Sequence, residues 1–126
     1  MTQSTHVAQV GGEHYQAELQ HWDLVEKYDV DYLIATATKY LTRWRKKGTP
    51  KLDLGKAASY IEKALLCRQG MGTLRLVPQD ALNEFYLGNG IHWMDAELMS
   101  ALLATGTHEA LQATLARVRD MEEGAE

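Results

Sequence analysis

The apolar residues of this chain recur at the spacing of an α-helix, and few residues interrupt that spacing. One such face is formed in the segment 32–46 by Leu33, Ala37, Leu41 and Trp44. Intervals of three and four positions bring side chains onto neighbouring turns of a helix. Only two of the 126 residues are proline, the residue that breaks helices most strongly. The sequence therefore predicts an all-α fold, a compact bundle of five or six short helices.

Residues that favour helix ends divide the chain into the expected helices. These run over about residues 19–28, 32–46, 53–69, 78–87, 95–105 and 108–123. Asp31 and Thr107 carry side chains that can cap a helix N-terminus, and Gly48 is expected to end the second helix. The segment 73–77 is the one expected strand.

The charges divide the chain at the flexible Gly70-Met71-Gly72. Residues 1–69 hold 10 basic and 8 acidic side chains, a net charge of +2, whereas residues 70–126 hold 3 and 9, a net charge of −6. We therefore expect a basic helical region over 1–69 and an acidic helical region over 70–126 that packs on it.

Basic residues are concentrated between positions 39 and 51, where no acidic residue occurs. The six are Lys39, Arg43, Arg45, Lys46, Lys47 and Lys51. Lys39, Arg43, Lys46 and Lys47 would share one helical face, with Tyr32 and Thr36 continuing it toward the N-terminus. Several cations on one rigid face match a phosphate group, and arginine can bind it through two hydrogen bonds. The alternative is that basic residues near a helix C-terminus complement its dipole and keep the helix soluble.

A second polar face is expected on the following helix, where Asp53, Lys56, Tyr60 and Lys63 are spaced by helical turns. In a helical hairpin, Lys56 and Tyr60 would converge with Arg43. That arrangement would form a pocket with cations, a hydroxyl and a ring on which a base can stack. The alternative is a weak surface ion pair between Asp53 and Lys56, beside an aromatic residue at the edge of the core.

The segment Gly11-Gly12-Glu13-His14-Tyr15 is a third candidate. Its two glycines let a backbone loop approach a ligand closely. His14 can donate a hydrogen bond to a phosphate or act as an acid–base group. The alternative is an arm whose Tyr15 packs against the bundle.

Several classes of protein lack their sequence signals here. No phosphate-binding Gly-x-x-x-x-Gly-Lys-[Ser/Thr] loop is present, and a single cysteine, Cys67, cannot form an internal disulfide. No apolar run is long enough to span a membrane, and no signal peptide is recognisable. We therefore expect a cytoplasmic protein with no membrane association and assign no metal site.

Three motifs occur in the order found in the small phage-encoded SaV-like family. They are His14-Tyr15, then Lys39-Tyr40-Leu41-Thr42-Arg43 with Lys46-Lys47-Gly48, then Asp53-Leu54 with Lys56-Ala57 and Tyr60. Over residues 11–66 the chain resembles that family. It departs from the family pattern at Arg45, where the family has glycine, and the resemblance does not extend to residues 70–126.

The resemblance implies a nucleotide site in the basic half of the chain. One podovirus member of the family is a nucleoside-monophosphate kinase that lacks a Walker loop. Carried over by position, the residues expected to line the site are His14, Tyr15, Lys39, Tyr40, Arg43, Lys46, Lys47, Asp53, Lys56 and Tyr60. In a kinase the cations would neutralise charge on the transferred phosphoryl group, and Asp53 would bind Mg²⁺ or orient a substrate hydroxyl.

The first hypothesis is a phage-encoded nucleotide-binding protein, in its most specific form a nucleoside-monophosphate kinase of phage nucleotide metabolism. A second is a non-catalytic protein that sequesters a host signalling nucleotide and so counters host defence. A third is a helical protein that binds nucleic acid, which the acidic half of the chain disfavours. A fourth is a structural or regulatory oligomer, and a homo-oligomer is also expected for the nucleotide-binding forms. Each would act in the cytoplasm of an infected bacterium.

Overall fold

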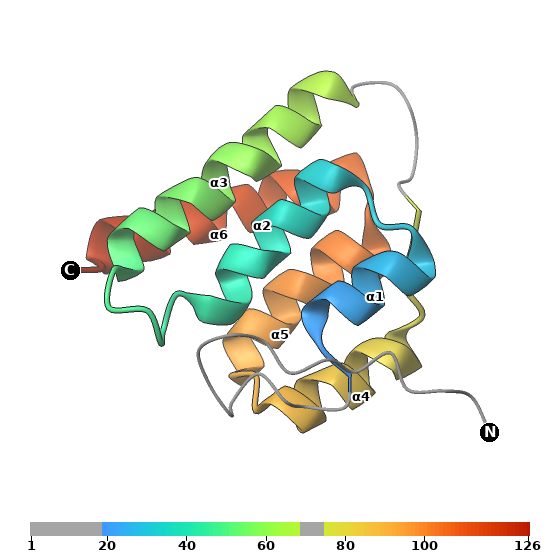
Figure 1. The fold of residues 1–126 in the computed structure, drawn as a ribbon. Helices are drawn as coiled ribbons and strands as arrows, with labels where there is room; N and C mark the ends of the chain where they lie inside the picture. Colours follow the sequence, from blue (N-terminus) through green and yellow to red (C-terminus); the bar gives the residue numbers. More distant parts are fainter. Residues whose placement is uncertain (1–18, 69–74) are drawn as a thin grey trace.

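The computed structural model describes residues 19–68 and 75–126 (Figure 1). Within them the helices are α1 (His21–Tyr28), α2 (Tyr32–Arg43), α3 (Pro50–Cys67), α4 (Gln79–Asn89), α5 (Trp93–Ser100) and α6 (His108–Gly124), and the π-helical segment η2 (Ala101–Thr105) continues α5. The prediction of an all-α bundle is therefore confirmed.

The prediction of a short strand at residues 73–77 is wrong for residues 75–77, which are the part of it that the structure describes. Residues 75–77 are irregular. The one buried residue among them, Val77, donates its backbone N–H to the carbonyl of Leu103 in η2, 2.8 Å away. A helical carbonyl therefore takes the hydrogen bond that a neighbouring strand would have taken.

Local capping sets several helix ends, as the sequence predicts. Asp31 Oδ2 accepts hydrogen bonds from the N–H groups of Leu33 and Ile34, at 3.0 and 3.3 Å, and so caps α2. The Thr107 hydroxyl accepts from Ala110 N at 3.1 Å and caps α6. These bonds satisfy backbone donors that the first turn of a helix leaves without an intrahelical partner.

The end of α2 differs from the sequence prediction. The helix stops at Arg43 rather than near residue 46, and Gly48, with φ of 81°, lies in the loop that follows. In the turn after Arg43, the indole of Trp44 and the guanidinium of Arg45 both bind the buried carboxylate of Asp95 on α5, at 3.2 and 2.8 Å. These two long-range contacts to Asp95 turn the chain out of the helix before Gly48 is reached.

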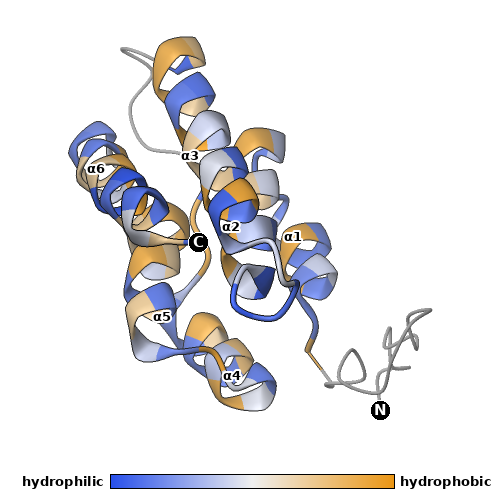
Figure 2. Ribbon diagram, turned by 90° about the vertical axis from the view of Figure 1, so that its left-hand side faces the viewer, coloured by the Kyte–Doolittle hydropathy of each residue, from blue (hydrophilic) through white to orange (hydrophobic). Residues whose placement is uncertain are grey.

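One core joins the basic and the acidic halves of the chain. The α2–α3 hairpin packs on α6 along α3 and on α5 along α2, as Figure 1 shows. The largest fully buried side chains come from both halves: Leu24, Ile34, Leu41, Leu54, Ile61, Val77, Leu82, Phe85, Leu98, Met99, Leu102 and Val118. Figure 2 shows apolar and polar residues on every helix, as expected where each helix buries one side.

The expected division at residues 70–72 lies outside the described residues. No helix that the structure describes combines the length and apolarity needed to cross a bilayer.

Candidate functional site

A cavity of about 220 Å³ lies between α1, the C-terminal half of α2 and the end of α4. Its cationic wall consists of Lys39, Arg43, Lys46 and Lys47. Its neutral wall consists of Gln20, the N-cap of α1, with His21 and Trp22 of that helix, and of Phe85 and Asn89 of α4 with Ile91 just after it. Thr42 completes the described lining, which contains no carboxylate. The cavity is therefore a place of positive potential.

The cationic wall continues past the end of α2. A tight turn follows the helix, because the N–H groups of Lys46 and Lys47 both donate to the carbonyl of Arg43, at 2.9 and 3.1 Å. Lys46 and Lys47 therefore stay beside Arg43 although the helix has ended. The four cations that the sequence places on one helical face line one cavity.

Arg43 differs from the other arginines of the chain. Among the described residues, the other five each pair with a carboxylate: Arg45 with Asp95, Arg68 with Asp31, Arg75 with Asp29, Arg117 with Glu97, and Arg119 with both Glu62 and Glu122. Arg43 has no such pair, and its Nε is buried without a hydrogen-bond partner there. A buried donor without an acceptor costs about 1–3 kcal/mol, and more when it is charged. An anion entering the cavity could satisfy this donor.

The ring of Tyr40 gathers cations from both helices of the hairpin. Lys39 Nζ lies 5.0 Å from the ring centroid, the guanidinium carbon of Arg43 5.6 Å and Lys56 Nζ 5.5 Å. Tyr60 stacks on Tyr40 at 6.4 Å. Such cation–π contacts hold like charges close together without a carboxylate. Because these cations and the ring of Tyr60 already surround the Tyr40 ring, Tyr40 is poorly placed to stack with a base.

His21 is neutral at physiological pH. Burial, aided by the positive charge of Lys39, lowers the pKa of His21 to about 4. Its Nε2 lies 2.8 Å from the hydroxyl of Thr38, which is also within 3.1 Å of the carbonyls of Ile34 and Ala35. The hydrogen bond between Nε2 and this hydroxyl holds the His21 ring against α2.

Trp22 is a lining residue that the apolar pattern did not identify as part of a site. The sequence predicts one short apolar face on this helix, made of Trp22, Leu24, Val25 and Tyr28. In the structure Leu24 is buried, whereas Trp22 is 47% exposed and lines the cavity. The spacing in the sequence already indicated this difference, because residues two positions apart on a helix point in nearly opposite directions.

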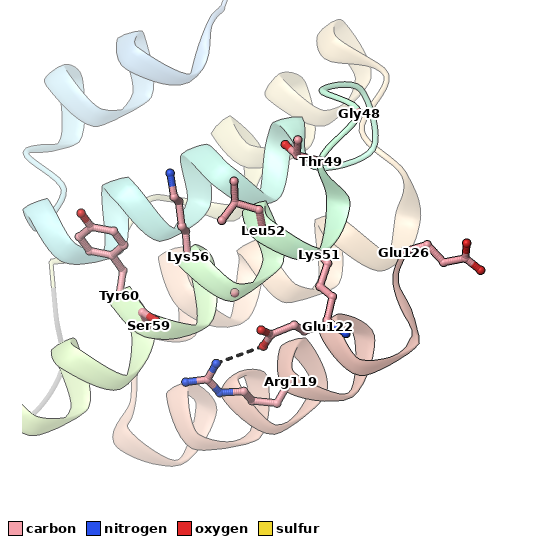
Figure 3. A pocket seen from close by; sticks show the side chains of 11 residues that line it. Gly48, Thr49, Lys51, Leu52, Lys56, Ser59, Tyr60, Arg119, Glu122 and Glu126 are labelled. Atoms are coloured by element: carbon pink, nitrogen blue, oxygen red, sulfur yellow. Dashed lines mark hydrogen bonds and ion pairs between the residues drawn. The ribbon is translucent and has the colours of Figure 1, made fainter.

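A larger groove, of about 760 Å³, lies between α3 and α6 (Figure 3). Lys56 and Tyr60 are among its lining residues, and Figure 3 shows both side chains pointing from α3 toward α2. The groove carries both signs of charge, since Arg119 and Glu122 on α6 form an ion pair at 3.1 Å. Of the predicted residues, Lys56 and Tyr60 therefore meet Arg43 at the ring of Tyr40 but line a different cavity from it.

Among the described residues, Tyr40 and Asp53 of the predicted set line neither cavity. Asp53 is 4% exposed in the first turn of α3, and its Oδ2 has no hydrogen-bond partner among the described residues. His14 and Tyr15 lie outside the described residues. In the part of the chain that the structure describes, no three His, Cys, Asp or Glu side chains are grouped as metal ligands.

A comparison with known protein families finds a match to the part of the chain that holds the cationic wall. Residues 10–62 match the sequence model of a family described as a protein of unknown function, DUF3310. The match spans α1, α2 and most of α3, and so contains the whole cationic wall, whereas α4 lies beyond it. No curated protein and no solved structure matches the chain.

Proposed function

We propose that this protein binds a nucleotide in the cavity between α1, α2 and α4. The observation that carries the proposal is Arg43, whose buried Nε has no partner in a cavity with three lysines and no carboxylate in its described lining. Phosphate oxygens accept strong charge-assisted hydrogen bonds from guanidinium and ammonium groups. A phosphate ester would satisfy Arg43 and reduce the repulsion among the four cations.

The lining favours a nucleotide over free phosphate. Trp22 presents part of its ring at the cavity, and a base can stack on such a face. The volume of about 220 Å³ lies below the range of about 300–1,000 Å³ typical of ligand pockets. A single phosphate-bearing molecule with part of its base outside fits this size better than a nucleic-acid strand does.

Two forms of this function differ in what happens to the ligand. A nucleoside-monophosphate kinase must hold a phosphoryl donor, with its Mg²⁺, beside the acceptor, and the cations would then stabilise the transferred group. A sequestering protein needs only tight binding. The small volume favours binding without transfer, which is the sequestering form.

A thermal-stability screen tests the proposal. A ligand that binds only the folded protein at a hundredfold excess over its Kd stabilises it by about 2.7 kcal/mol, so the unfolding midpoint must rise. The screen covers nucleoside mono-, di- and triphosphates, with inorganic phosphate for comparison. Arg43→Met should reduce the shift to a small fraction of the wild-type value, and Lys63→Met, at an exposed position on α3 that lines neither cavity, should leave it unchanged.

An activity assay on the same protein distinguishes the kinase from the sequestering protein. Incubation with a nucleoside monophosphate, ATP and Mg²⁺ yields a nucleoside diphosphate from that substrate only if phosphoryl transfer occurs. If no nucleotide raises the midpoint of the wild-type protein, nucleotide binding at this cavity is wrong in both forms.

A further inference from the structure

We infer that the exposed face of the α2–α3 hairpin binds single-stranded nucleic acid, at a site separate from the cavity. The inference rests on a cluster of lysine and tyrosine side chains, nearly all of which nucleotide binding in the cavity leaves unused. We call this cluster the hairpin face, and it consists of Tyr32, Lys39 and Tyr40 on α2 and of Lys56, Tyr60 and Lys63 on α3. Of these side chains, Lys39 also lines the cavity and the others do not.

Three tyrosine rings join the two helices across the hairpin face. Tyr60 stacks on Tyr40, with ring centroids 6.4 Å apart, and on its other side meets the ring of Tyr32 at 6.3 Å and 80°. Cations already surround Tyr40, but Tyr32 is 69% exposed. Unpaired bases stack on exposed aromatic rings whatever the sequence of the strand. Tyr32 therefore offers an unpaired base a ring that the protein leaves open.

The lysines of the hairpin face are exposed and lie toward its two ends. Lys39 Nζ and Lys56 Nζ are 5.0 and 5.5 Å from the centroid of the Tyr40 ring. Lys63 follows Lys56 by two turns on the same side of α3, which is about 10 Å along the helix. Because the helices of a hairpin are antiparallel, this direction leads toward Tyr32. Cations spaced in this way match successive phosphates of a strand better than a single phosphate group.

No free carboxylate of the hairpin opposes these lysines. The hairpin and its N-terminal cap contain three acidic residues, Asp31, Asp53 and Glu62. Asp31 pairs with Arg68, and Asp53 is 4% exposed. Glu62 pairs with Arg119 of α6. The acidic half of the chain packs behind the hairpin along α5 and α6 (Figure 1). The hairpin face therefore keeps a positive potential although the whole chain has a net charge of −4.

The combination of an open ring with lysines favours a single strand over a duplex. The bases of a duplex are paired and stacked on one another, so only the lysines would contribute to binding it. In a single strand the bases are free to stack on Tyr32 while the phosphates still reach the lysines. An anionic membrane surface would also attract the lysines, but it offers no base to the tyrosine ring.

Fluorescence anisotropy with a labelled oligothymidylate of about 12 nucleotides tests the inference on the full chain. Raising the salt from about 50 to about 200 mM should weaken binding about 20-fold if three lysines contact phosphates. At the higher salt, the strand should bind about tenfold more tightly than a duplex of equal length, the contribution of one stacked base. Equal affinities for strand and duplex overturn the inference. Binding to phosphatidylserine vesicles without binding to the strand overturns it as well.

A pair of variants tests the role of the tyrosine ring. Tyr32→Leu should weaken strand binding about tenfold and leave duplex binding unchanged. Trp93→Leu removes another exposed ring, at the start of α5 and outside the hairpin face, and should leave strand binding unchanged. Full strand affinity in a folded Tyr32→Leu variant overturns the inference. Should that variant not fold, by circular dichroism, the comparison of strand and duplex on the wild-type protein still decides.

A second pair tests the lysines and separates this site from the cavity. Lys63→Met should reduce the slope of log affinity against log salt by about 0.7, whereas Arg117→Met, which removes an equal charge paired with Glu97, should not change it. Tyr32 and Lys63 do not line the cavity, so variants at both should keep the thermal shift that nucleotides cause. If the wild-type protein binds no strand, the inference is wrong and the proposed function stands. If it binds the strand but no nucleotide, the reverse holds.

Discussion

The cavity between α1, α2 and α4 and the groove between α3 and α6 both contain basic side chains, but they differ in what neutralises them. In the groove Arg119 pairs with Glu122 at 3.1 Å and with Glu62 at 3.3 Å. In the cavity the described lining holds Arg43 and three lysines and no acid. The groove is larger, yet its arginine already has the partners that a ligand anion would supply. A basic cluster therefore indicates a binding site only where the fold leaves it without carboxylates.

The largest effect expected from this comparison is on nucleotide affinity. Arg43→Met should weaken nucleotide binding by about 100-fold, because loss of a desolvated charge partner costs about 2–5 kcal/mol. Arg119→Met should change the affinity by less than about twofold. Calorimetric titration of both variants measures the difference, and comparable losses in the two would refute the distinction between the cavities.

His21 in the cavity should make the free energy of unfolding fall in mild acid. The described lining of the groove contains no histidine and should make no such contribution. The pKa of His21 is about 4 in the folded protein, below the 6.5 of an exposed histidine, so the unfolded chain takes up the proton first as pH falls. His21 therefore contributes stability that is complete above about pH 6.5 and is lost toward pH 4. At 1.36 kcal/mol per pH unit below 6.5, we expect a loss of about 2 kcal/mol between pH 7.5 and pH 5.

Urea unfolding at a series of pH values measures this loss. His21→Asn should flatten the dependence over that range, and His108→Asn, at an exposed position, should not. An equally steep dependence in His21→Asn would assign the pH response to another group.

A third prediction concerns the turn that carries Lys46 and Lys47 into the cavity. Asp95→Ala removes the acceptor of Trp44 and Arg45, and should lower the free energy of unfolding by about 1–2 kcal/mol. The cost stays moderate because Arg45 is partly exposed and can be hydrated. Nucleotide affinity should fall as well, since the turn after Arg43 loses its anchor. Full affinity in a destabilised Asp95→Ala variant would show that the turn holds its position without Asp95.

The smallest effect is expected in the groove. A Cβ at position 55 would lie 2.8 Å from Glu122 Oε2, the end of a flexible side chain that can rotate away. Gly55→Ala should therefore stabilise the protein by about 0.5 kcal/mol, the helix gain of alanine less the loss of a surface ion pair. Gly88→Ala on α4, where a Cβ meets nothing, should give the full gain of about 0.5–1 kcal/mol. A stability loss in Gly55→Ala would show that the carboxylate cannot move, and denaturant unfolding decides.

The site was predictable only in part. The sequence places Lys39, Arg43 and Lys46 on one helical face, and all three line the cavity, although Lys46 does so from the turn after α2 rather than from the helix. Trp22 and Asn89 carried no local pattern that linked them to those cations. They belong to α1 and α4, and only the packing of these helices against α2 brings them to the same cavity.

By itself the sequence determined the helices and several of their ends, since periodicity and the caps at Asp31 and Thr107 act over a few residues. It also determined that basic residues share one face of α2. The tertiary structure alone decided where α2 stops, because Asp95 lies about 50 positions from the turn that it holds. It decided as well which cations meet carboxylates, because the sign of the local charge depends on segments that become neighbours only when the chain folds.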